Sequence, residues 1–455
     1  MPPSQRPNIL FIMTDQLRFD YLGAAGADFV RTPNIDRIAE RGMRFTQCCS
    51  NAPICAPARI ALATGLMAGR TGALTNVRFL SREQTTYYQR LRDDNYRVGC
   101  CGKLDLAKPD PWNSTGDRPC AFTFGFTHPV EIEGKMHSGN RPEPQGPYGL
   151  ELQQHGLYDA YHADYAARAR NRWVKNASHD SVLPAEWFQD TYIGRRSVAW
   201  LEGVGDDFPW HLFVSFAGPH DPFDPPAAYA ERYRDAAVPA AIHDELAGKP
   251  ACLRNKQRGL DDAEIAHTRR QYCASIEAID DAVGDILDVL ERRGMLENTY
   301  ILFSADHGEM LGDHGLYTKN VMYEPSLRLP LLVAGPGIDG GRVSDAPVEL
   351  IDVNPTICEL AGLPAQEGID ARSFVGVCHG ETDRHRDATV SELEHCRCVR
   401  TDRWKLIENY NEVTELYDLQ ADPQELDNVA ADHPEQVAEL RGIFRARILE
   451  RQWRW

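Results

Sequence analysis

Short apolar runs recur along the chain and alternate with segments in which apolar residues return every three or four positions. Runs without polar alternation are typical of strands buried on both faces. They occupy residues 8–14, 97–101, 211–216, 299–305 and 329–334. Helical periodicity marks residues 33–42, 57–67 and 272–293. Strands that alternate with helices predict an α/β fold with a large, mostly parallel sheet flanked by helices.

The pattern changes from about residue 380 onwards. Three short strand-like runs and a final helical pattern follow, at residues 398–400, 404–407, 415–419 and 434–450. We therefore expect a main α/β domain over residues 1–380 and a smaller antiparallel α+β subdomain over residues 381–455.

Residues 105–190 interrupt the regular alternation. They are rich in Pro, Gly, His, Trp and Tyr and show weak periodicity, which predicts an irregular insert that shapes a binding site. Its aromatic and histidine residues include Trp112, His128, His137, Tyr148, Tyr158, Tyr161, His162 and Trp173. Such side chains would either pack inside the insert or line a pocket for an aryl, sugar or quaternary-ammonium group.

The charge balance narrows the choice of partners. The chain has 49 Lys and Arg against 67 Asp and Glu, a net charge of −18, which argues against nucleic acid and anionic membrane surfaces. No apolar stretch reaches the roughly 18 residues of a membrane span, and the first residues do not form a secretion signal. We expect a cytoplasmic protein whose 12 cysteines are reduced and mostly buried as small apolar residues.

Polar residues follow four of the predicted strands. They are Asp15 and Gln16, then Lys103 and Asp105, then His220 and Asp221, and finally Asp306 and His307. Parallel strands present their carboxyl ends at one edge of a sheet, where ligands of α/β proteins bind. Each of these residues alone could cap a turn or order a loop. Together they predict one site assembled from distant parts of the chain.

The donor atoms at these strand ends suit a metal ion. Asp15 and Asp306 offer carboxylates, Gln16 an amide oxygen and His307 an imidazole nitrogen. This oxygen-rich set favours a hard divalent ion, Ca²⁺, Mn²⁺ or Mg²⁺, and the imidazole tilts the choice towards Mn²⁺. Lys103 and Lys319 are candidates to neutralise a bound anion.

Cys55 lies just before the helix predicted from residue 57. A helix N-terminus lowers the pKa of a thiol and attracts anions, so Cys55 could serve as a nucleophile. The neighbouring sequence offers no histidine base, and a buried structural thiol is the alternative.

With these residues assembled, the chain resembles the formylglycine-dependent sulfatases of the alkaline phosphatase superfamily. Cys55-Ala56-Pro57-Ala58-Arg59 matches the C-x-P-x-R signature of that family. Further family-like blocks are "PNILFIMTDQLRFDYLG" (7–23), "TPNIDRIAERGMRF" (32–45), "SFAGPHDPFDPP" (215–226), "LFSADHGEMLGDHGLYTK" (302–319) and the segment 400–430. The resemblance covers nearly the whole chain.

The resemblance implies a role for each matching residue. Asp15, Asp306 and His307 would bind the metal, with Gln16 beside them. Cys55, oxidised after translation to Cα-formylglycine, would also ligate the metal and act as the nucleophile, and Arg59 would orient it. The substrate-side contacts would come from Lys103, His220, Lys319 and Asn76.

Two departures from the common family pattern stand out. Many sulfatases have aspartate in place of Gln16 and asparagine in place of His307, and the pattern here looks more like choline sulfatases and phosphonate monoester hydrolases. The block G-K-W-H appears as Gly102-Lys103-Leu104-Asp105, so Asp105 replaces the histidine that usually breaks down the reaction intermediate. Asp105 or His220 is then the candidate base.

The expected activity is hydrolysis of an aryl, sugar or small alkyl sulfate monoester. One alternative is a phosphonate monoester hydrolase or phosphodiesterase with the same machinery, and another is a non-catalytic binding protein on the same fold. Maturation would require a formylglycine-generating enzyme. The tail "RILERQWRW" (447–455) carries two tryptophans that could dock on a neighbouring subunit, which predicts a homo-oligomer.

Overall fold

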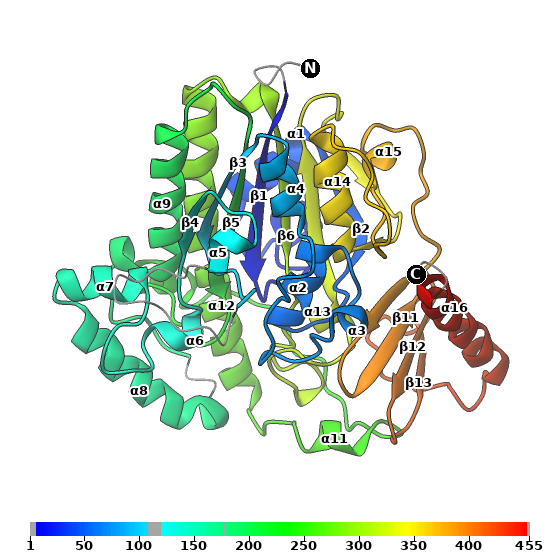
Figure 1. The fold of residues 1–455 in the computed structure, drawn as a ribbon. Coiled ribbons are helices and arrows are strands. Elements are labelled where there is room, and N and C mark those ends of the chain that lie inside the picture. Colours follow the sequence, from blue (N-terminus) through cyan, green and yellow to red (C-terminus); the bar gives the residue numbers. More distant parts are fainter. Residues whose placement is uncertain (1–5, 108–119, 176–177, 453–455) are drawn as a thin grey trace.

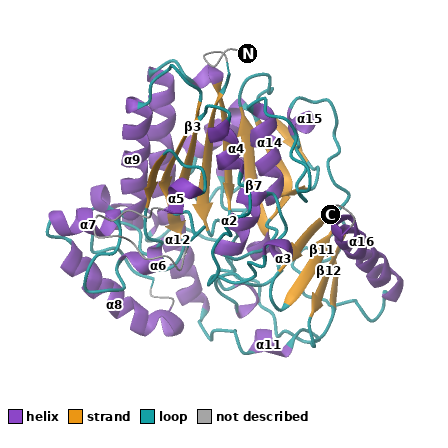
Figure 2. Cartoon of the chain, viewed as in Figure 1, coloured by secondary structure: helices purple, strands orange, loops and turns teal. Residues whose placement is uncertain are grey.

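The computed structural model describes residues 6–107, 120–175 and 178–452. Within them, a nine-stranded sheet forms the centre of the molecule, with helices in front of it and behind it (Figures 1 and 2). Its strands are β1 (Asn8–Asp15), β2 (Met43–Cys49), β3 (Arg97–Gly102), β4 (His128–Glu131), β5 (Trp210–Pro219), β6 (Thr299–Ala305), β7 (Arg328–Ala334), β8 (Arg342–Ser344) and β9 (Val348–Glu349).

The strand order is β4-β3-β5-β1-β6-β7-β2-β8, and β9 also pairs with β2. The strands from β4 to β6 in this order run parallel, whereas β7 is antiparallel to both of its neighbours. This arrangement confirms the predicted α/β fold with a mostly parallel sheet. The central strands β1, β5 and β6 are buried along almost their whole length, as their continuous apolar runs predict.

Two helical layers cover the sheet. On one face lie α1 (Pro33–Arg41), α9 (Gln189–Gly203) and α12 (Asp262–Arg292), and on the other lie α2 (Cys55–Thr64), α4 (Tyr87–Asp93) and α14 (Val353–Leu360). Shorter helices connect these elements: α3 (Ala68–Thr71), α5 (Cys120–Thr123), α10 (Ala227–Ala230), α11 (Ala251–Arg254), α13 (Glu324–Leu327) and α15 (Val375–Cys378). The apolar side chains between the layers form the main hydrophobic core.

A separate antiparallel sheet follows near the carboxyl end. It has the order β10 (Thr389–Glu392), β11 (Cys396–Arg400), β12 (Trp404–Asn409) and β13 (Glu415–Asp418), and α16 (Pro434–Gln452) packs beside it. Buried Glu324 of α13 binds Arg400 at 2.9 Å and Lys405 at 3.1 Å, which connects this sheet to the larger part. We propose that residues 1–380 and 381–455 are the two structural units.

The insert is more regular than its weak periodicity predicts. It contains α6 (Lys135–Ser138), α7 (Pro147–Gln154) and the long α8 (Tyr158–Lys175). The prediction of irregular structure is therefore wrong for these residues. Tyr148, Tyr158 and Tyr161 are buried, and the Tyr161 ring packs against both of the others, so these aromatic residues serve the packing of the insert.

Two further expectations concern cysteines and membranes. Eleven of the 12 cysteines are buried, and none forms a disulfide with another described residue, in agreement with their role as small apolar side chains. Among the described residues, no helix has the length and apolar character needed to cross a bilayer.

Candidate active site

Four neighbouring strands end at one edge of the large sheet and bring the predicted polar residues together. β1 pairs with both β5 and β6, and β3 pairs with β5 on its other side. Asp15 at the end of β1 lies opposite Pro219, directly before His220 in the chain. The expected single site, assembled at the carboxyl ends of parallel strands, is therefore present.

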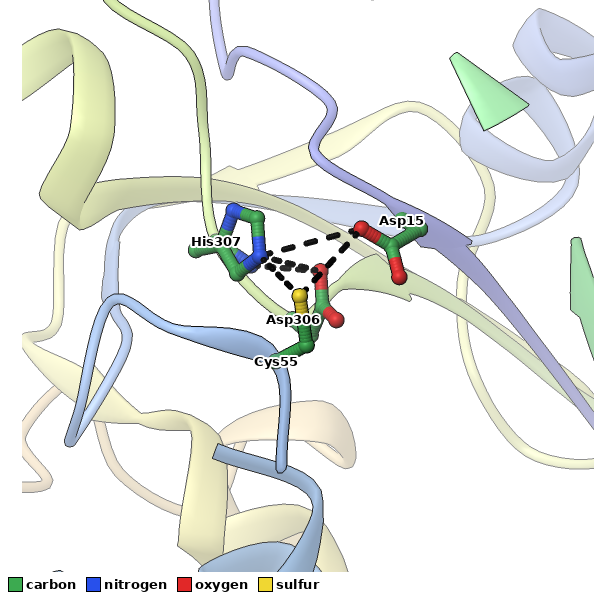
Figure 3. Close-up of side chains that lie close together, drawn as sticks. All are labelled: Asp15, Cys55, Asp306 and His307. Atoms are coloured by element: carbon green, nitrogen blue, oxygen red, sulfur yellow. Dashed lines mark hydrogen bonds and ion pairs between the residues drawn. The ribbon is translucent and has the colours of Figure 1, made fainter. Parts of the chain in front are cut away.

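Asp15, Cys55, Asp306 and His307 form a compact buried cluster (Figure 3). One ligand-type atom from each residue lies within 4.8 Å of those from the others. The Cys55 Sγ is 3.1 Å from His307 Nε2 and 3.8 Å from Asp15 Oδ1. Two buried carboxylates beside an imidazole are a donor set that fits a divalent cation.

The protonation of this cluster follows from its charges. Burial raises the pKa of the Asp15 carboxyl, but neighbouring cations, Lys103 first among them, hold it well below its ordinary range. Burial lowers the pKa of His307, but the Asp306 carboxylate and Cys55 together outweigh this and raise it. The His307 Nδ1–H donates to the Gly308 carbonyl at 3.0 Å, so its Nε2 faces the cluster.

Arg59 holds the two carboxylates from behind. It lies one helical turn after Cys55 on α2, and only 2% of its surface is exposed. Its Nε donates to Asp306 Oδ2 at 2.8 Å, and its Nη2 donates to Asp15 Oδ2 at 3.2 Å. Its Nη1 donates to the Lys103 carbonyl and the Ser215 hydroxyl, both at 2.7 Å. All three of its side-chain nitrogens donate hydrogen bonds, so Arg59 holds the site residues in fixed orientations.

Cys55 is the first residue of α2, and its side chain faces the cluster and not the sheet core. The backbone N–H of Ala56 donates to Asn76 Oδ1 at 2.9 Å, which fixes the start of the helix. Burial and the Asp15 carboxylate raise the pKa of the Cys55 thiol, but the surrounding cationic groups, among them Lys103, Lys319 and His307, together outweigh both and hold it well below its ordinary value.

Lys103 follows β3, and its side chain reaches the donor cluster. Its Nζ contacts Asp15 Oδ2 and lies 3.1 Å from Asp105 Oδ2. Gly102 makes this approach possible, because its φ is +119° and an added Cβ would lie 1.9 Å from the Ser215 carbonyl oxygen. Burial lowers the pKa of Lys103, but Asp105 and Asp15 raise it well above its usual value.

Gln16, Lys319 and His220 form a second group next to the cluster. The Gln16 backbone N–H donates to Asp306 Oδ1 at 3.1 Å, and its side-chain Oε1 accepts a hydrogen bond from Lys319 Nζ. Lys319 Nζ is also 2.5 Å from His220 Nε2. Gln16 therefore lies next to Asp306, but its amide oxygen, which the sequence offers as a metal ligand, accepts from Lys319.

A cavity of about 600 Å³ opens over this site. Five of the predicted residues line it: Cys55, Asn76, Lys103, His220 and Lys319. Asp105 is not part of its lining, although it contacts Lys103. The cavity is several times larger than a sulfate ion, so it has room for a leaving group as well.

Apart from His137, the rest of the lining is not among the residues named from the sequence. It consists of Val77 and of Gly134, Lys135, Met136, His137 and Asn140. The last five come directly after β4, a four-residue strand at the same sheet edge that contains Pro129 and therefore gives no strand signal in the sequence. His137 is the one insert residue named from the sequence that lines the cavity. Trp112 and the side chain of Trp173 lie outside the described residues.

Taken together, the site can bind an anion beside a metal ion and present the side chain at position 55 to it. The fold and this site define a hydrolase of the alkaline phosphatase superfamily. A family model described as "Sulfatase" matches residues 7–363, and one described as "N-sulphoglucosamine sulphohydrolase, C-terminal" matches residues 312–452. The chain belongs to the sulfatase family.

Individual relatives agree with this assignment. The chain is 29% identical to the choline-sulfatase of Rhizobium meliloti over 448 residues, covering 93% of this chain and 82% of the relative. It is 27% identical to the arylsulfatase of Clostridium perfringens over 474 residues, covering 96% and 94%. The structure of the phosphonate monoester hydrolase of Agrobacterium radiobacter superposes with a TM-score of 0.82 at 24% identity, covering 98% and 96%, and shows the same fold.

Proposed function

We propose that this protein hydrolyses a sulfate monoester and that Cys55, converted to Cα-formylglycine, is its nucleophile. The observation that carries the proposal is the position of Cys55. It begins α2, its Sγ belongs to the buried donor cluster with Asp15, Asp306 and His307, and it also lines the cavity. A nucleophile between a metal-type cluster and an open cavity is the arrangement that attack on a bound sulfate requires.

Asp15, Asp306, His307 and the modified Cys55 would hold one divalent ion, Ca²⁺ or Mn²⁺, with Mg²⁺ also compatible with the donors. When bound, the ion supplies positive charge that acidifies a hydroxyl group and draws charge from the sulfate oxygens. A hydrated formylglycine carries two hydroxyl groups on one carbon, so one can attack sulfur and the other can later release a proton to expel sulfate.

The protein's own residues supply the remaining chemistry. Arg59 fixes the carboxylates and the start of α2. Lys103 would place its ammonium group next to the oxygens of a bound sulfate. His220 and Lys319 also line the cavity and contact each other, and they would donate a proton to the departing oxygen. Asp105 contacts Lys103 but does not line the cavity, so we assign the later proton removal to His220 before Asp105.

The modification of Cys55 is open to a direct measurement. Mass spectrometry of the peptide containing Cys55, from protein produced with a formylglycine-generating enzyme, should show loss of H₂S and gain of one oxygen. Peptides with the buried cysteines Cys100 and Cys378 should keep their calculated thiol masses in the same digest. Unmodified Cys55 in fully active protein would contradict the proposed nucleophile.

The role of His220 predicts a dependence on the leaving group. His220→Gln should lower kcat/KM by about 10²–10⁴-fold for sulfate esters of poor leaving groups, and much less for activated aryl sulfates that leave without a proton. Steady-state kinetics with a series of aryl sulfates of graded leaving-group pKa measures the slope of log kcat/KM against that pKa. Equal losses for all esters would remove His220 as the general acid.

A phosphonate monoester or phosphodiester hydrolase is the second candidate. The structural likeness to a phosphonate monoester hydrolase, together with Gln16, Asn76 and His307, favours it. Parallel turnover of aryl sulfate, phosphodiester and phosphonate substrates would separate the two by the ratio of their kcat/KM values. The cytoplasmic location, the formation of a homo-oligomer through the tail and the identity of the metal stay predictions; Trp453 and Trp455 lie outside the described residues.

A further inference from the structure

Glu309 lies directly behind the candidate site, although it does not line the cavity. It follows the metal-type residues Asp306 and His307 by three and two positions, and its side chain is fully buried. Its carboxylate contacts two parts of the chain at once. One oxygen faces Gln16 after β1, and the other faces the loop that ends at Lys319.

The first contact determines which way the Gln16 amide points. Gln16 Nε2 donates to Glu309 Oε2 and also lies 3.4 Å from Asp221 Oδ1. Carboxylate oxygens accept hydrogen bonds, so the NH₂ group faces Glu309 and Asp221 and the amide oxygen faces the other way. That oxygen therefore points towards Lys319, from which it accepts a hydrogen bond.

The second contact fixes the loop that carries Lys319. Glu309 Oε1 accepts from the backbone N–H of Leu311 at 3.0 Å and from that of Thr318. Leu311 and Thr318 have φ of +47° and +65°, a region that non-glycine residues enter at a cost of about 1–3 kcal/mol each. A buried acceptor that engages both N–H groups offsets this cost and holds the two ends of the loop together.

We propose that Glu309 is a positioning residue for the proton-donating side of the site. It acts through Gln16 and through the 311–318 loop, which together place Lys319 Nζ against His220 Nε2. Glu309 belongs neither to the cavity lining nor to the metal-type cluster, so its effect on a substrate would be transmitted by Gln16, this loop and Lys319.

A reciprocal exchange tests this arrangement. In the double variant Gln16→Glu/Glu309→Gln the amide of residue 309 can donate to the new carboxylate while its oxygen still accepts from Leu311 and Thr318. Gln16→Glu alone places two carboxylates against each other, and Glu309→Gln alone can place two NH₂ groups together. We expect each single change to lower the thermal midpoint of the metal-free protein, and the double variant to recover at least half of the summed loss. Additive losses would overturn the proposal.

Turnover provides the readout that a merely structural role would not move. The turnover measurement rests on the proposed sulfatase function, whereas the stability comparison of the single and double variants does not. Failure of the positioning role can therefore be told apart from failure of the proposed function. Glu309→Gln should lower kcat/KM at least tenfold more for poor leaving groups than for activated aryl sulfates. Glu425→Gln, which alters a buried carboxylate paired with Lys405 in the carboxyl-terminal part, should reduce stability without changing that slope.

A folded variant is needed for these measurements. If Glu309→Gln alone does not fold, Glu309→Asp keeps the charge but shortens its reach by one methylene, and it should shift the slope in the same direction by a smaller factor. An unchanged slope in the folded variant contradicts the positioning role.

Discussion

Replacing Cys55 with alanine should lower kcat/KM for sulfate esters by about 10³-fold or more, the scale on which loss of a nucleophile acts. The reason is that alanine removes the atom that lies between the donor cluster and the cavity, while Asp15, Asp306 and His307 remain in place. Steady-state kinetics on protein of verified metal content measures the loss.

A second buried cysteine serves as the control. Cys378 in α15 is as deeply buried as Cys55, but it lies outside the donor cluster and the cavity lining. Cys378→Ala should cost some stability through the small cavity it leaves and should keep the wild-type kcat/KM. Substantial turnover by Cys55→Ala, at the same protein purity, would contradict the assignment of the nucleophile.

The strands that carry the site were predictable because they are buried on both faces. β1, β5 and β6 read as unbroken apolar runs, and the polar residues after them could be placed at one edge by the rule for parallel sheets. β2 was missed because its burial alternates irregularly and it follows α1 after a single glycine. The short β4 was missed as well, and the cavity wall after it was missed in consequence.

The start of a helix is harder to predict from the sequence than its amphipathic middle. The amphipathic part of α12 was recognised from residue 272, but the helix begins at Asp262. Asp261 and Glu264 form a capping box there, in a stretch with few apolar residues, so periodicity gives no signal. The role of Glu309 could not be read from the sequence either, because its partners, Gln16 and Thr318, are brought to it by the fold.

Replacing Arg59 with methionine should destabilise the metal-free protein by about 3–5 kcal/mol, the usual cost of removing one partner from a buried charge group. Methionine keeps an unbranched apolar side chain but leaves the Asp15 and Asp306 carboxylates buried without the guanidinium that now binds both. Chemical denaturation of the metal-free variant measures this loss. The stability of Arg59→Lys should lie between those of the wild type and Arg59→Met, because lysine keeps the charge but cannot donate to both carboxylates as the guanidinium does.

An exposed arginine–aspartate pair serves as a control that separates the effect of burial from the effect of removing a charge. Arg403 binds Asp418 at 2.7 Å on the surface, where solvent screens the interaction, so Arg403→Met should leave the denaturation midpoint almost unchanged. Adding a divalent ion should restore part of the stability of Arg59→Met, because the ion binds the same carboxylates in the folded protein only. If Arg59→Met is no less stable than Arg403→Met, the carboxylates do not depend on Arg59, and the proposed charge balance of the site is wrong.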